Sequence, residues 1–67
     1  MEYLNLPARY VYVHFEDGTK ENAAMTDTLS REEAEDFKQD WEKWKHKKVT
    51  RVTLATKGGE ICKTYKF

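Results

Sequence analysis

Apolar and polar side chains alternate over residues 9–16, as expected for a β-strand that buries one of its two sides. Val11, Val13 and Phe15 fall on one side of this segment. The opposite side carries Tyr10, Tyr12 and His14. Because β-branched and aromatic residues favour extended backbone, the pattern predicts a strand with an apolar side and an aromatic side.

An Asp-Gly pair follows at positions 17 and 18 and indicates a tight hairpin turn, since both residue types accept positive φ angles. Residues 19–25 should then return as a second, weaker strand. A turn of two residues gives two cross-strand pairs, Val13 with Asn22 and Val11 with Ala24. A turn with a glycine bulge would shift this register by one residue, and both registers stay open.

A helix is predicted over residues 31–47. Ser30 and Glu33 have the spacing of a capping box, in which each side chain satisfies a backbone amide that the first helical turn leaves unpaired. One stripe of the helix then carries residues at spacings of three and four: Ala34, Phe37, Trp41, Trp44 and Lys48. The other positions are polar, so the stripe should face the core, with Trp41 and Trp44 as its main anchors.

Residues 49–56 and 61–67 are again rich in β-forming types, and the glycines at 58 and 59 between them predict a second hairpin. One face of this hairpin should hold the pairs Val52–Tyr65, Leu54–Lys63 and Thr56–Ile61. The other face should hold Arg51–Lys66, Thr53–Thr64 and Ala55–Cys62. The first of these faces is the more apolar and is expected to contact the helix.

The predicted order is therefore ββαββ, with strands at 9–16, 19–25, 49–56 and 61–67 and a helix at 31–47. A single apolar helix stripe requires a single apolar sheet face. We therefore expect an α+β, two-layer sandwich in which a four-stranded, mainly antiparallel sheet carries one helix on one face. Residues 1–8 precede this domain of residues 9–67 as an arm, because Pro7 disfavours regular structure around it. The open sheet face should carry Tyr10, Tyr12, His14, Glu16, Arg51, Thr53, Thr64 and Lys66.

The length and the cysteine content limit the chemistry. A chain of 67 residues supports one small core. Cys62 is the single cysteine, so an intrachain disulfide or a cysteine-based zinc cluster is excluded. No metal-binding, phosphate-binding or nucleophile motif is present, and we expect neither a cofactor, nor a metal, nor a catalytic residue.

The sequence also bears on location. The first residues lack the basic and apolar regions of a secretory signal, and no segment reaches the roughly 18 apolar residues of a membrane span. Together with the lone cysteine, these features favour a cytoplasmic protein that does not contact a membrane.

Charge is sorted along the chain although the net charge is zero. Residues 1–42 hold eleven acids and four bases, whereas residues 43–67 hold eight bases and one acid. Lysines at the end of the helix suit the negative pole of its dipole, so that part of the asymmetry has a local cause. The bases of the second hairpin have no such cause, which suggests a charged partner.

Two classes of function fit these features. The first is a small non-enzymatic protein-interaction module, a regulator or an inhibitor, that binds a protein through the open sheet face and the basic C-terminal hairpin. The alternative is a nucleic-acid-binding domain that uses the same aromatic and basic face. Self-association into a homo-oligomer is compatible with the charge pattern. The candidate partner-binding residues are Tyr10, Tyr12, His14, Arg51, Lys57, Lys63 and Lys66.

Overall fold

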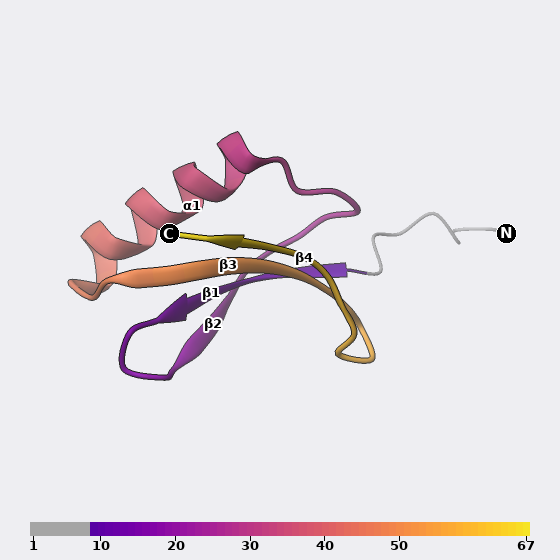
Figure 1. Cartoon of the computed structure of the whole chain (residues 1–67), viewed down its shortest axis with the longest axis horizontal. Coiled ribbons are helices and arrows are strands. Elements are labelled where there is room, and N and C mark those ends of the chain that lie inside the picture. The colour runs from indigo at the N-terminus through magenta and orange to yellow at the C-terminus, as the bar shows by residue number, and fades with distance from the viewer. Residues whose placement is uncertain (1–8) are drawn as a thin grey trace, which may run out of the picture.

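The computed structural model describes residues 9–67, and within them the predicted order of two hairpins around one helix is confirmed. The elements are β1 (Arg9–Phe15), β2 (Lys20–Met25), α1 (Arg31–Lys45), β3 (Val49–Thr56) and β4 (Ile61–Lys66). The strands form one antiparallel sheet in the order β2-β1-β3-β4, and α1 lies across one side of it (Figure 1). This is the expected α+β arrangement of two layers. The expected arm, residues 1–8, lies outside the described residues.

The first hairpin turns through the three residues 16–18, so the glycine-bulge alternative is confirmed. The amide of Phe15 donates to the carbonyl of Thr19 at 2.8 Å, and Gly18 adopts a φ of 90°. A residue with a side chain would be strained at that angle. The carboxylate of Asp17 accepts from both the amide and the hydroxyl of Thr19, at 3.0 and 2.6 Å, which holds the turn in shape.

This turn changes the pairing of the two strands. Val13 lies opposite Glu21 and not opposite Asn22, so that predicted pair is wrong. Further from the turn, β2 contains one extra residue between Asn22, which pairs with Tyr12, and Ala24. This bulge restores the predicted pairing of Val11 with Ala24. The hairpin therefore contains two irregularities that compensate each other.

Helix α1 begins as predicted and ends two residues early. The Ser30 hydroxyl accepts from the amide of Glu33 at 3.1 Å, and the Glu33 carboxylate accepts from the amide of Ser30 at 2.9 Å, which completes the capping box. The last helical residue is Lys45, because His46 adopts a left-handed conformation with φ 57° and ψ 37°. Lys48, expected on the helix stripe, consequently lies beyond the helix.

In the second hairpin, the predicted register is correct for the residue pairs that are distant from the turn. The confirmed pairs are Arg51–Lys66, Val52–Tyr65, Thr53–Thr64 and Leu54–Lys63. The two predicted pairs nearest the turn, Ala55–Cys62 and Thr56–Ile61, are wrong. The turn again has three residues, 57–59, with Gly59 at a φ of 97°, and Cys62 is an extra residue that leaves Ala55 opposite Ile61.

The core lies between α1 and the inner sides of β1 and β3. Its buried apolar residues are Val11, Val13, Phe15, Leu29, Ala34, Val49, Val52 and Leu54. Phe37 and Trp41 pack against this cluster and are partly buried. The expectation that Trp44 is a second core anchor is wrong, since this residue is 64% exposed. Trp44 lies in the last helical turn, about 80° around the helix from Ala34, and packs on Trp41 with 4.8 Å between ring centroids.

Two hydrogen bonds join the layers at opposite ends of the helix. The hydroxyl of Tyr65 in β4 donates to the carbonyl of Leu29 just before α1, at 2.8 Å. The carboxylate of Glu42 in α1 accepts from the amide of Val49, the first residue of β3, at 2.8 Å. The helix is thus fixed to the sheet at its start and near its end.

Candidate functional site

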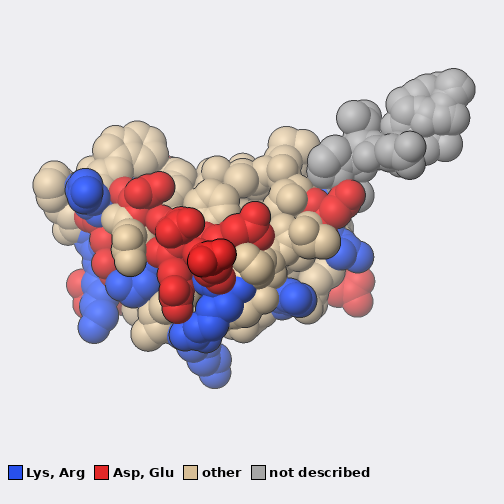
Figure 2. All heavy atoms as spheres, turned by 90° about the horizontal axis from the view of Figure 1, so that it is seen from above, with Lys and Arg blue, Asp and Glu red and all other residues tan. Residues whose placement is uncertain are grey.

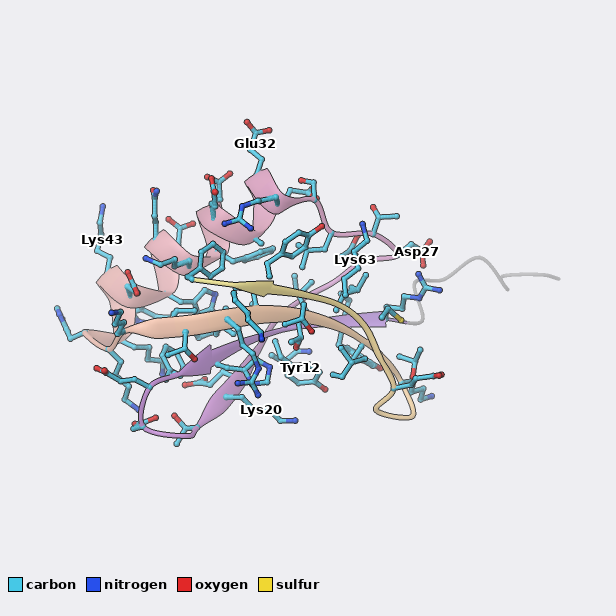
Figure 3. All side chains as sticks on the ribbon, viewed as in Figure 1. Tyr12, Lys20, Asp27, Glu32, Lys43 and Lys63 are labelled. Atoms are coloured by element: carbon cyan, nitrogen blue, oxygen red, sulfur yellow. The ribbon has the colours of Figure 1, made fainter. Side chains whose placement is uncertain are left out.

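The side of the sheet that faces away from α1 is called the outer face here. Residues directly opposite each other in neighbouring strands point to the same side, so the register defines this face. Its strand positions are Lys20, Asn22 and Met25 in β2, Tyr10, Tyr12 and His14 in β1, Arg51, Thr53 and Ala55 in β3, and Ile61, Thr64 and Lys66 in β4. Figure 3 shows Tyr12 and Lys20 on this side of the sheet, away from the helix. Glu16, which was expected on this face, lies in the first turn instead.

One line of cross-strand neighbours on the outer face consists only of basic side chains. It is called the basic row and contains, in order across the sheet, Lys20, His14, Arg51 and Lys66. Because neighbouring strands lie about 4.8 Å apart, the row spans about 14 Å. The row brings together segments from both ends of the described chain, and only the strand order β2-β1-β3-β4 makes it continuous.

His14 sits in the middle of this row and is partly buried. Its Nε2 atom lies 2.8 Å from the hydroxyl oxygen of Thr53, with which it shares a hydrogen bond. Burial, followed by the positive charges of Arg51 and Lys20, lowers the pKa of His14 below its ordinary value. His14 is therefore neutral at pH 7, and gains its charge only in more acidic solution or beside an anion.

The middle of the outer face holds two tyrosines beside small residues. Tyr10 and Tyr12 project from the central strand β1 with their ring centroids 6.4 Å apart and their planes at 51°. Thr53 and Ala55 lie opposite them in β3 and are each 2% exposed, although no helix covers this side of β3. Their burial on the open side of a sheet requires cover from adjacent side chains, and the half-buried tyrosine rings are the large neighbours in register.

Two apolar side chains lie at the end of the outer face opposite the basic row. Met25 in β2 is 57% exposed and Ile61 in β4 is 54% exposed. Each lies on an edge strand, with Tyr10 and Ala55 between them in the same cross-strand line. The outer face thus changes from basic to aromatic to apolar along the strands.

Acidic side chains collect on the other layer. Figure 2 views the molecule from above α1 and shows Asp and Glu gathered over the helix. The helical acids are Glu32, Glu33, Glu35, Asp36, Asp40 and Glu42. Among residues 9–67, no strand position of the outer face is occupied by Asp or Glu. Helix α1 also carries Arg31, Lys38, Lys43 and Lys45, so it is net acidic, whereas every charged strand position of the outer face is basic.

Part of the charge asymmetry is neutralised within the molecule. Lys45 pairs with Glu21 at 3.0 Å, and Lys47 pairs with Asp17 at 2.9 Å. Hydrogen bonds from Thr19 and then from Lys47 lower the pKa of Asp17 well below its usual range. These contacts give the lysines at the end of the helix acidic neighbours on the first hairpin, so those lysines do not require an external partner.

The structure separates the seven candidate residues into two groups. Five of them share the outer face: Tyr10, Tyr12, His14, Arg51 and Lys66. Lys57 lies in the second turn, and Lys63 lies on the helix side of β4 (Figure 3), with its ammonium 3.5 Å from the hydroxyl of Tyr65. Lys20 was missed, although it lies opposite His14. A three-residue turn with glycine in its last position would have predicted this pairing from the sequence.

Three features of residues 9–67 bear on possible metal binding and chemistry. No group of three or more His, Cys, Asp or Glu side chains within residues 9–67 is arranged to hold a metal ion. Cys62 is exposed on an edge strand, with the carbonyl oxygen of Glu60 as its polar neighbour at 3.8 Å. A shallow hollow of about 170 Å³ is lined by Glu33, Asp36, Phe37 and Asp40, all from α1. That lining combines three carboxylates with one aromatic ring.

Comparison with protein-family models, with curated proteins and with solved structures found no match for this chain. In the part of the chain that the structure describes, no helix is long and apolar enough to cross a membrane.

Proposed function

We propose that this chain is a small, non-enzymatic binding module that contacts a macromolecular partner through the outer face of its sheet. One observation carries the proposal. The face is left uncovered by the helix and combines aromatic, apolar and basic side chains in register, without a carboxylate at any of its described strand positions. Exposed surfaces that combine aromatic residues with arginine are typical of interfaces.

The alternative use of the outer face, as an ordinary solvated sheet surface, accounts for the features less well. A solvated face usually mixes charges of both signs. Here the like charges of Arg51 and Lys66 lie directly opposite each other, one strand spacing apart, an arrangement that is unfavourable until an anionic group joins them. Burial of the exposed side chains of Met25 and Ile61 against a partner would also remove apolar surface from water.

The proposal can be tested by affinity recovery from a cell lysate, comparing the wild type with two outer-face variants, Tyr12→Ala and Arg51→Glu. Lys43→Glu is the matched control, because it makes the same charge change at an exposed position of α1. We expect both outer-face variants to lose the bound material and the control to keep it. Unchanged recovery with Tyr12→Ala and Arg51→Glu, each shown by circular dichroism to be folded, would contradict the proposal.

A further inference from the structure

We infer that the partner of the outer face is a single-stranded nucleic acid, with phosphates along the basic row and bases stacked on Tyr10 and Tyr12. This inference rests on the proposed function, since it assigns a partner class to the same surface. Single-strand binding surfaces combine aromatic side chains, on which bases of any sequence can stack, with cations that follow the sugar-phosphate backbone. The outer face has both components in adjacent lines of its register.

The charge distribution favours binding of an anionic chain on the outer face. Lys20, Arg51 and Lys66 present three cations along the basic row, and His14 lies between the first two. A phosphate placed against this row meets no carboxylate from the strands, because the described acids lie on α1, in the turns, in the connection after β2 and at the helix-side position of Glu21. The acidic helix layer disfavours the same ligand on the opposite side of the molecule (Figure 2). Electrostatics therefore orients a polyanion toward the outer face.

The two tyrosines of the outer face provide aromatic rings on which bases can stack. Tyr10 and Tyr12 are two residues apart on one strand and lie 6.4 Å from each other, so that their rings form neighbouring platforms. The ammonium of Lys20 lies 4.8 Å from the ring centroid of Tyr12. The ammonium lies over this ring, so a base that stacks on the same side of Tyr12 would displace it toward the adjoining phosphate.

The shape of the face favours a single strand over a duplex. A duplex is read by an element that enters a groove, such as a helix or a two-stranded ribbon. The outer face is the open side of a sheet, and a tyrosine ring on it can stack only on a base that is free of its own stack. An acidic protein segment could also neutralise the basic row, but it would gain less from the paired tyrosines.

The test is fluorescence anisotropy with a labelled single strand of about 12 nucleotides and mixed sequence, as DNA and as RNA, at about 50 mM salt. We expect both single strands to bind and the matching duplex to bind more weakly. If three or four phosphates are neutralised, the logarithm of the affinity should fall with the logarithm of salt concentration with a slope of about −2 to −3.

Four variants test the individual contacts. Tyr12→Leu, which keeps an apolar side chain and removes the ring, should weaken binding by about 5- to 100-fold, and Tyr12→Phe should restore it. Arg51→Gln should weaken binding and reduce the salt slope by about 0.7. Lys43→Gln on α1 should leave the affinity within about twofold, since it removes a charge from the other layer.

Two results of the anisotropy measurements would overturn the inference. One is the absence of binding to either single strand at about 50 mM salt. The other is a loss of affinity with Lys43→Gln as large as that with Arg51→Gln. The lysate experiment described above separates the two proposals. If recovery of a protein partner depends on Tyr12 and Arg51 but is unchanged after nuclease treatment of the lysate, the outer face is the contact surface and the nucleic-acid assignment is wrong. If recovery does not depend on those residues, the proposed function itself fails.

Discussion

Replacing Glu42 by alanine should lower the free energy of unfolding by about 1–3 kcal/mol. One carboxylate oxygen of Glu42 accepts from the amide of Val49 at 2.8 Å, and the other accepts from the ammonium of Lys38 at 3.0 Å. Val49 is fully buried where β3 begins, so truncation at position 42 leaves its amide without an acceptor. Glu42 therefore acts as a link between the end of the helix and the sheet.

The magnitude follows from these contacts. A buried donor left unsatisfied costs about 1–3 kcal/mol. The ion pair with Lys38, whose two side chains are each 27% exposed, contributes about 0.3–0.5 kcal/mol, and the higher helix propensity of alanine offsets a similar amount. Domains of this size are stable by about 3–10 kcal/mol, so the loss is a large fraction of the total.

Urea denaturation followed by tryptophan fluorescence measures the change, because Trp41 and Trp44 both lie on α1. Glu35→Ala is the matched control. Glu35 also forms an ion pair at spacing four, with Arg31 at 3.3 Å, but their side chains are 50% and 59% exposed. We expect this control to change stability by less than about 0.5 kcal/mol. Equal losses for Glu42→Ala and Glu35→Ala would refute the assigned role of the Val49 amide.

The same variant has a pH signature. The hydrogen bond from the Val49 amide, followed by the contacts with Lys38, lowers the pKa of Glu42 in the folded protein. A lowered pKa means that the folded state favours the carboxylate, so this contribution is fully present above the ordinary glutamate pKa. It is lost as the pH falls below about 4 and through the folded-state value. The stability difference between the wild type and Glu42→Ala should therefore shrink in that range, and a difference independent of pH would contradict this reasoning.

Two further predictions concern the aromatic residues of the helix and the histidine of the basic row. Trp41→Ala should lower stability by about 2–4 kcal/mol and Trp44→Ala by less than about 1 kcal/mol in thermal melts, since only Trp41 packs on the core; equal losses would contradict this. An NMR titration should find the pKa of His14 below that of a free histidine, and Arg51→Gln should raise it, whereas an unchanged value would exclude the neighbouring charge as a cause. Because the folded state disfavours the protonated imidazole, His14 should reduce stability as the pH falls below about 6.5.

The hairpins and the helix start could be predicted because their signals are local. The alternation over β1 assigns Val11 and Val13 to the core side, and both are fully buried. The capping box of Ser30 fixes the start of the helix by contacts that span three residues. Each of these features depends on neighbours in the sequence and on backbone preferences that operate without the rest of the fold.

The candidate binding surface was predictable only in part. Alternation within single strands identified Tyr12 and His14 as outward-facing residues, and the second hairpin contributed Arg51. Lys20 was missed because its position depends on a turn of three residues and not two. Lys63 was expected on the helix-facing side of its hairpin and lies there, so it belongs to the basic hairpin but not to the outer face.

The sequence by itself determined the type and order of the elements, the positions of the two turns, and the inner and outer sides of β1 and β3. The tertiary structure alone decided that β1 lies beside β3, and hence that cations from three strands form one line with His14. It also decided that Lys45 and Lys47 are paired with acids of the first hairpin, and that Trp44 remains in solvent. These outcomes depend on contacts between segments that are distant in the sequence. Such contacts depend on which faces of the helix and the strands bury one another in the folded protein. A local pattern of residues does not contain that information.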